Sequence, residues 1–200
     1  MIAIIDYGMG NLASVEKALT FLNIDSIITN DEKMINKASH IILPGVGSFE
    51  QGMTNLKELN LIEILNREVI KNKKPFIGIC LGMQLIMENG SEPKLCKGLG
   101  WIKGDVKLIE NNKLPVPHLG WNRVYKKEFE FEEDKLNDNY YFIHSYHVIP
   151  KENVIETYVD YEFPMVASIR RGNIFATQFH PEKSQKAGLK LLENYFKSYA

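Results

Sequence analysis

The first half of the chain alternates between short apolar runs and stretches in which apolar residues recur at helical spacing. The short runs predict buried strands at Ile2–Ile5, Ser26–Thr29, His40–Leu43 and Pro75–Cys80. The helical stretches predict helices over Asn11–Asn23, Leu61–Ile70 and Leu81–Glu88. Strands that alternate with helices in this way form parallel sheets that are covered on both faces.

The second half of the chain is richer in extended segments, at Val106–Ile109, Tyr140–Ile149, Val154–Val159, Met165–Arg170 and Ile174–Phe179. We expect a hairpin around Arg171–Asn173, an exposed loop over the acidic run Glu128–Asp134, and a closing helix from about Lys186 with Leu189, Leu192 and Phe196 on one face. The sequence thus predicts one domain over residues 1–200. Its fold is a three-layer α/β fold, with a mostly parallel central sheet, helices on both faces and an additional antiparallel region in the second half.

Composition and charge narrow the classes of function. Apolar residues make up 44% of the chain and charged residues 24%, which is typical of a globular protein. The 24 Lys and Arg nearly balance the 25 Asp and Glu, so neither nucleic acid nor an anionic membrane is expected as a main partner. No apolar stretch approaches the roughly 20 residues of a membrane-spanning helix. The N-terminus lacks the basic flank of a signal peptide, so we expect a cytoplasmic protein.

A glycine-rich turn follows the first predicted strand. Gly8–Ala13 fits the dinucleotide-binding fingerprint, and Asp31 stands about 20 residues further on. Glycines also serve any tight strand-to-helix turn, because glycine tolerates positive φ. Since the rest of the chain points to different chemistry, we expect neither NAD nor another cofactor.

The strongest chemical signal is a cysteine between an apolar strand and a helix. Gly78–Gly82 reads Gly-Ile-Cys-Leu-Gly, the cysteine form of the nucleophile elbow. The sharp turn strains the backbone at Cys80, and the flanking glycines let neighbouring chain come close. A helix N-terminus also favours a thiolate. The alternative is a buried structural cysteine. Cys96 lacks this context and reads as an inert thiol, and the two cysteines form no metal spacing, so no metal site is expected.

A cysteine nucleophile needs a base, and the base needs an orienting group. Among the five histidines, His40 begins a strand and His118 is expected in an irregular loop. His180 is the most suggestive, because Glu182 follows two residues later and alternate residues of an extended chain point the same way. Pro181 between them restricts the backbone. The alternative is a surface turn with an ordinary ion pair.

These segments resemble the class I (triad) glutamine amidotransferases. The resemblance rests on Gly78–Gly82 with Gln84, and on His180-Pro181-Glu182. Further segments are similar to one branch of that class, the glutaminase subunits of imidazole glycerol phosphate synthase. They are Asp6–Asn11, Pro44–Phe49, Pro117–Asn122 and Tyr141–Tyr146. The resemblance runs from Met1 to the last helix.

The resemblance implies hydrolysis of glutamine, with Cys80 as nucleophile, His180 as general acid and base, and Glu182 as its orienting group. The oxyanion of the tetrahedral intermediate would be held by the backbone N–H of Leu81 and by the Pro44–Gly47 loop near Val46. The two glycines of that loop would permit a peptide flip. Contacts to the substrate are implied for Gly47, Gln84 and Glu92, and for the backbone at Ser145 and Tyr146.

The resemblance also implies a partner. Members of this branch form a heterodimer with a (β/α)8 barrel subunit, which receives the ammonia. The products are imidazole glycerol phosphate and an aminoimidazole carboxamide nucleotide, in histidine biosynthesis. Residues implied near the partner surface are Asn11, Trp121, Tyr141 and Lys183.

Some features depart from the branch and leave alternatives open. A paired glutamate is expected after Gln84, but Asn89–Lys94 contains only Glu92, and His147 stands at a position where an aromatic or basic residue is expected. Close paralogues supply ammonia for the amidation of surface sugars. Anthranilate and pyridoxal phosphate systems fit less well, because they are expected to carry a double glycine within the Pro44–Gly47 loop. A non-catalytic nucleotide-binding module and a cysteine peptidase are further alternatives.

Overall fold

The computed structural model describes residues 1–110, 113–126 and 139–199. Its main sheet has nine strands in the order β2-β1-β3-β4-β13-β12-β11-β8-β9. The first five are parallel: β1 (Ile2–Ile5), β2 (Ser26–Thr29), β3 (His40–Gly45), β4 (Phe76–Cys80) and β13 (Ile174–Thr177). The other four are antiparallel: β8 (His118–Tyr125), β9 (Asn139–His144), β11 (Ile155–Tyr161) and β12 (Phe163–Arg171).

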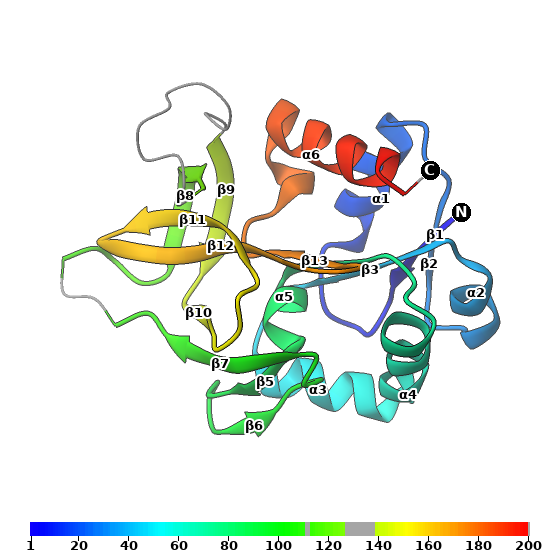
Figure 1. Ribbon diagram of the computed structural model, residues 1–200, viewed down its shortest axis with the longest axis horizontal. Coiled ribbons are helices and arrows are strands. Elements are labelled where there is room, and N and C mark those ends of the chain that lie inside the picture. The colour runs from blue at the N-terminus through cyan, green and yellow to red at the C-terminus, as the bar shows by residue number, and fades with distance from the viewer. Residues whose placement is uncertain (111–112, 127–138, 200) are drawn as a thin grey trace.

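Helices cover both faces of the parallel half (Figure 1). One face carries α1 (Leu12–Phe21) and α6 (Gln185–Lys197), and the other carries α2 (Glu32–Lys37), α3 (Phe49–Glu58), α4 (Leu61–Leu65) and α5 (Leu81–Leu85). Strand alternation explains the two layers, because Ile2 and Ile4 pack towards α1 and α6, whereas Ala3 and Ile5 pack towards the opposite helices. The predicted three-layer α/β fold is therefore confirmed.

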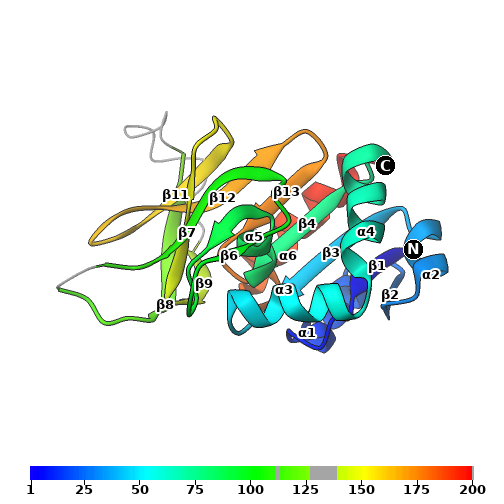
Figure 2. The same cartoon turned by 90° about the horizontal axis from the view of Figure 1, so that it is seen from below.

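A second sheet of four strands lies beside the main one (Figure 2), in the order β10-β7-β5-β6. Its strands are β5 (Met87–Gly90), β6 (Cys96–Lys97), β7 (Ile102–Leu108) and β10 (Tyr146–Pro150). The segment Tyr140–Ile149 is extended as predicted, but it is divided between two strands, because the chain leaves the main sheet after His144 and enters the second sheet at Tyr146. Both halves are extended and half-apolar, so periodicity alone shows no break at Ser145.

Further corrections concern the elements around the site. His118 does not lie in an irregular loop but begins β8, where it is the register partner of His144. The helix predicted over Leu81–Glu88 ends at Leu85, and β5 follows. The helix predicted over Leu61–Ile70 exists as α4, continued by a π-helical turn at Asn66–Lys71. The acidic run Glu128–Asp134 lies outside the described residues.

Two helices were missed by the sequence reading. In α2, the side chain of Asp31 caps the helix by accepting from the backbone N–H of Met34. In α3, the buried Phe49, Met53 and Leu56 follow helical spacing, so a signal was present. No helix in the described part of the chain is long and apolar enough to cross a membrane.

The parallel register brings three strand ends together. Gly45 at the end of β3 pairs with Cys80 at the end of β4, and Thr177 at the end of β13 pairs with Ile79. Segments that follow these strands therefore begin at the same edge of the sheet. In open α/β sheets, this carboxyl edge is where ligands bind.

Candidate active site

Cys80 occupies the strained turn that the sequence predicts. It ends β4 with φ 54° and ψ −107°, and α5 begins at the next residue. The flanking glycines allow α5 to pack closely on β3 and β4. A Cβ on Gly82 would overlap the carbonyl oxygen of Leu43, and a Cβ on Gly78 would lie 2.9 Å from the carbonyl oxygen of Gly82. Tight packing of α5 on β3 thus holds Cys80 in a left-handed conformation that non-glycine residues seldom adopt.

The His180–Glu182 pair lies beside Cys80. His180 Nδ1 donates to Glu182 Oε1 at 2.7 Å, and both side chains are buried. The contact was expected from strand alternation, but that reason was wrong. Pro181–Lys183 forms a 3-10 turn directly after the extended His180, and the turn brings the carboxylate back to the imidazole.

The electrostatics favour a proton on His180. Burial lowers the pKa of His180, but the negative charges of the Cys80 thiolate and the Glu182 carboxylate outweigh it and raise the pKa above its ordinary value. With Nδ1 held by Glu182, Nε2 is the ring nitrogen left for another partner. Nε2 is buried and has no hydrogen-bond partner among the described residues.

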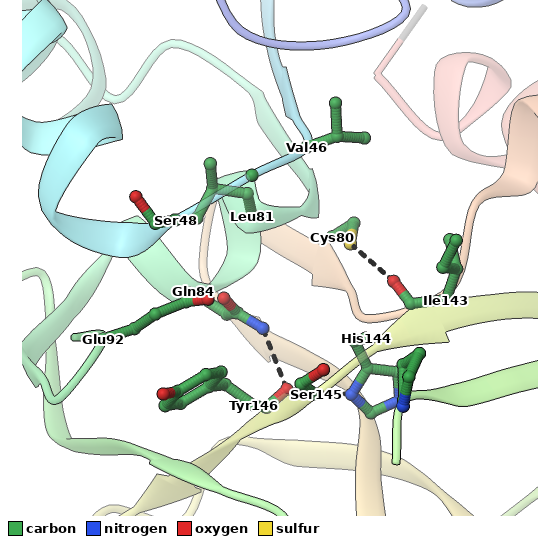
Figure 3. A pocket seen from close by; sticks show the side chains of 12 residues that line it. Val46, Ser48, Cys80, Leu81, Gln84, Glu92, Ile143, His144, Ser145 and Tyr146 are labelled. Carbon is green, nitrogen blue, oxygen red and sulfur yellow. Dashed lines mark hydrogen bonds between the residues drawn. The ribbon is translucent and has the colours of Figure 1, made fainter. Parts of the chain in front are cut away.

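A cavity of about 340 Å³ opens above Cys80 (Figure 3). Its size is that of a small-molecule pocket. Seven of the implied residues, besides Cys80, lie in its wall: Val46, Gly47, Leu81, Gln84, Glu92, Ser145 and Tyr146. The structure adds Ser48, Pro117, Ile143 and His144 to this wall.

The Pro44–Gly47 segment leaves β3 level with Cys80. Gly45 pairs with Cys80, which places Val46 on the cavity wall together with Leu81. Gly47 has φ +107°, a conformation that favours glycine. The backbone of this loop and that of Leu81 therefore border the space where an oxyanion on a substrate of Cys80 would form.

The implied substrate residues are already engaged with the protein. Gln84 Nε2 donates to the backbone oxygen of Tyr146 at 2.9 Å (Figure 3). Glu92 Oε2 accepts from the backbone N–H of Phe49 at 3.1 Å. Burial raises the pKa of Glu92, and the hydrogen bond from Phe49 offsets only part of this. Ser145 stands at the break between β9 and β10.

Three of the four implied partner residues contact one another. Trp121 of β8 and Tyr141 of β9 are register partners with ring centroids 5.8 Å apart, and Lys183 Nζ lies 5.8 Å from the centroid of the Tyr141 ring. Trp121 is 45% exposed, which is high for a large aromatic side chain. Asn11 instead caps α1, accepting from the backbone N–H of Ser14. Helix α1 contacts the turn that carries Lys183.

Sequence reasoning missed a buried hydrogen-bond chain behind the cavity. The backbone oxygen of Tyr146 accepts from His144 Nδ1 at 2.8 Å. His144 Nε2 and His118 Nδ1 are 2.9 Å apart, and His118 Nε2 lies 2.6 Å from Asn122 Nδ2. Because a carbonyl only accepts, His144 donates from Nδ1, His118 donates to His144, and Asn122 donates to His118. Burial lowers the pKa of His118 to about 4 and that of His144 to about 3.

Gln178 was also missed. Its side-chain Nε2 lies 3.6 Å from Cys80 Sγ, and its side chain is fully buried. A signal for it existed, since Gln178 precedes His180 by two residues in the same extended segment. A second polar neighbour of Sγ is the backbone oxygen of Ile143, at 3.8 Å (Figure 3).

The class of protein follows from the fold, the site and a family comparison. The family model described as glutamine amidotransferase class-I matches residues 3–198. The chain therefore belongs to the class-I glutamine amidotransferases, as the sequence resemblance indicated.

Individual relatives show which members of this family the chain is similar to. The chain is 50% identical to "Imidazole glycerol phosphate synthase subunit HisH 2" of Methanococcus maripaludis, over 98% of this chain and 99% of the relative. It is 48% identical to the HisH subunit of Aquifex aeolicus, over 96% and 94%. Among solved structures, one titled "Crystal structure of glutamine amidotransferase" matches with a TM-score of 0.78 at 14% identity, covering 100% of this chain and 99% of the other. At that identity the match shows the fold alone.

Gly82→Ala is expected to destabilise the protein by about 3 kcal/mol, because the added Cβ overlaps the Leu43 carbonyl and pushes α5 from β3. Urea unfolding followed by circular dichroism measures the change. Gly52→Ala in α3 is the control, since the nearest atoms to its Cβ are the movable side-chain tips of Leu85 and Leu81, and we expect a change below about 1 kcal/mol. Equal midpoints for Gly82→Ala and the parent would contradict this account of the turn.

The histidine chain predicts loss of stability in mild acid. His118 and His144 have folded-state pKa values below the ordinary 6.5, so the unfolded chain binds protons first as the pH falls. The free energy of unfolding is then expected to fall between about pH 6 and 4, by about 1.4 kcal/mol per pH unit for each group. His118→Gln removes one group, and its slope against pH is expected to be shallower by that amount. An unchanged slope would show that His118 is already protonated in the folded state.

Proposed function

We propose that the chain is a glutaminase that hydrolyses glutamine to glutamate and ammonia through Cys80, His180 and Glu182. The observation that carries the proposal is the position of Cys80, on a strained turn at the floor of a cavity, with the buried His180–Glu182 pair beside it. Membership of the glutamine amidotransferases supports glutamine as the substrate. The chemistry requires only groups of this chain and water.

The proposed reaction has two halves. Cys80 gives its proton to His180 Nε2 and attacks the side-chain amide carbon of glutamine. The carbon–nitrogen bond breaks as His180 returns the proton to the leaving nitrogen, which gives ammonia and a γ-glutamyl thioester. Water then loses a proton to His180 and attacks the thioester. The carbon–sulfur bond breaks, glutamate leaves and the thiolate is restored.

The cavity wall supplies the remaining roles in the proposal. Backbone N–H groups of Leu81 and of the loop at Val46 stabilise the oxyanion in both halves. Glu92 attracts the α-ammonium group, and the backbone at Ser145 and Tyr146 holds the α-carboxylate. Gln84 and Gly47 border the bound substrate. A zwitterionic amino acid requires such a pair of opposite contacts.

We further propose that the ammonia passes to a (β/α)8 barrel partner that makes imidazole glycerol phosphate and an aminoimidazole carboxamide nucleotide. Relatives at 45–50% identity are named as subunits of imidazole glycerol phosphate synthase. A partner also fits the chemistry, because free ammonia is mostly protonated near neutral pH. The face formed by Trp121, Tyr141 and Lys183, with Asn11 nearby, is the proposed docking surface.

The alternative partner is a surface-sugar amidation enzyme. Methanococcus maripaludis has two numbered HisH relatives, at 50% and 45% identity to this chain. Two such subunits in one organism are consistent with two ammonia acceptors. The glutaminase chemistry is the same in both cases.

Cys80→Ala is expected to abolish glutamate release from glutamine, because no other group supplies the nucleophile. The assay compares the purified chain with and without a histidine-pathway barrel subunit and its nucleotide, and strong stimulation is expected with both. Cys96→Ala is the control and is expected to retain activity, since Cys96 lies outside the cavity wall. Glutamate release by Cys80→Ala at the parental rate would exclude the proposed nucleophile.

Trp121→Ala is expected to weaken binding of the barrel subunit about tenfold or more, as truncation of a central aromatic residue does at many interfaces. Titration calorimetry measures the dissociation constant. Phe21→Ala is the control, because Phe21 is a 73% exposed aromatic residue at the opposite end of α1 from Asn11. Equal effects of the two variants would place the docking surface elsewhere. Binding to a sugar-amidation barrel but not to the histidine-pathway barrel would select the alternative partner.

A further inference from the structure

Gln178 makes a contact that the three proposed catalytic residues do not explain. Register places it beside the nucleophile, because β13 ends at Thr177, which pairs with Ile79, the residue before Cys80. Its backbone is fixed on both sides. The Gln178 N–H donates to the oxygen of Ala167 at 2.8 Å, and the Thr177 hydroxyl donates to the oxygen of Phe179 at 2.9 Å.

The amide of Gln178 has one permitted orientation. The backbone oxygen of Tyr146 only accepts, so the Gln84 atom 2.9 Å from it is the nitrogen Nε2. The same nitrogen lies 3.1 Å from the Gln178 side chain and donates to its Oε1. The other atom of the Gln178 amide is therefore Nε2, and this N–H donor faces Cys80 Sγ at 3.6 Å.

A fixed donor discriminates between the two forms of the nucleophile. A thiolate is a charged acceptor and gains strongly from an N–H donor, whereas a thiol or thioester sulfur is a weak acceptor. The alternative contact of Sγ, the backbone oxygen of Ile143 at 3.8 Å, accepts a hydrogen bond from a thiol but repels a thiolate. His180 also faces the thiolate, but its Nε2 must be free to pass a proton to and from substrate.

Burial makes the contact costly to lose. Gln178 has no exposed side-chain surface and Gln84 is also buried, so no solvent is at hand to replace either hydrogen bond. A hydrogen bond to a charged group is stronger in such surroundings than in water. The backbone oxygen of Tyr146 accepts from Gln84 and also from His144. One carbonyl therefore orients both hydrogen-bond networks, the one that leads to Gln178 and the one that leads to His118.

We infer that Gln178 is a positioning residue for the nucleophile: its amide, oriented by Gln84 and the Tyr146 carbonyl, donates to the Cys80 thiolate and stabilises it against the thiol. This inference rests on the proposed function, in which Cys80 acts as a thiolate. Gln178 is not among the residues that line the cavity. It acts before attack, by keeping Sγ ionised and in place, and again in hydrolysis of the thioester, when the thiolate leaves.

The test is the rate of alkylation of Cys80 by iodoacetamide as a function of pH, in the full chain with Cys96→Ser. Gln178→Met keeps an unbranched side chain of similar size but removes the donor. The midpoint of its profile is expected to lie roughly one pH unit above that of the parent, with about tenfold slower alkylation on the acidic side. Thr157→Val is the matched control. It removes a buried hydrogen bond to Ser168, 2.6 Å away, that does not touch Cys80, and its midpoint is expected to be unchanged.

An unchanged midpoint in Gln178→Met, with cooperative unfolding preserved, would overturn the inference and leave Gln178 a packing residue. If Gln178→Met does not fold, Gln178→Leu replaces it. This variant also removes the donor without adding a charge beside the sulfur, so a midpoint shifted upward supports the inference and an unshifted one overturns it. Failure of the proposed function would look different. If the midpoint depends on Gln178 but the chain releases no glutamate from glutamine, the role of Gln178 as a donor stands and the glutaminase proposal is rejected.

Discussion

The contact between Gly82 and the carbonyl of Leu43 is the constraint on which the site depends. It lets α5 start immediately after β4, so that the turn between them contains no residue other than Cys80 in a left-handed conformation. The cost of that conformation is met by the buried packing of α5 against β3 and of β4 against its two parallel neighbours. Cys80, the proposed nucleophile, is thereby raised at the carboxyl edge of the sheet, and the ends of β3 and β13 place the proposed oxyanion loop and Gln178 near it.

The second half of the chain closes the site from above. The break between β9 and β10 at Ser145 turns the chain from the main sheet into the second sheet, and the Tyr146 carbonyl at this corner accepts from both Gln84 and His144. Hydrogen bonds thus connect this corner to α5 through Gln84, and to β8 through His144, His118 and Asn122. Since β8 and β9 also carry Trp121 and Tyr141, the proposed docking surface and the cavity wall share two neighbouring strands. A partner bound at the proposed docking surface would therefore have a short physical route to the cavity.

The parallel half was predictable because its elements have strong local signals. The apolar runs of β1 to β4, the stripes of α1 and α6, and Gly78–Gly82 each specify their structure nearly alone. The chain break at Ser145 was not predictable, since it depends on which sheet each half joins. Glu182 was paired with His180 for the wrong reason, because a turn rather than strand alternation brings them together. Gln178 and His118 were missed because a buried polar residue shows its role only when its hydrogen-bond partners, distant in sequence, are known.

The central claim is that Cys80 attacks glutamine and becomes acylated. The most direct test is rapid acid quenching of the full chain during turnover with isotope-labelled glutamine, followed by peptide mass spectrometry. The account predicts a labelled γ-glutamyl group on the peptide that contains Cys80 and none on the peptide that contains Cys96. Glutamate production without any label on Cys80 would contradict it.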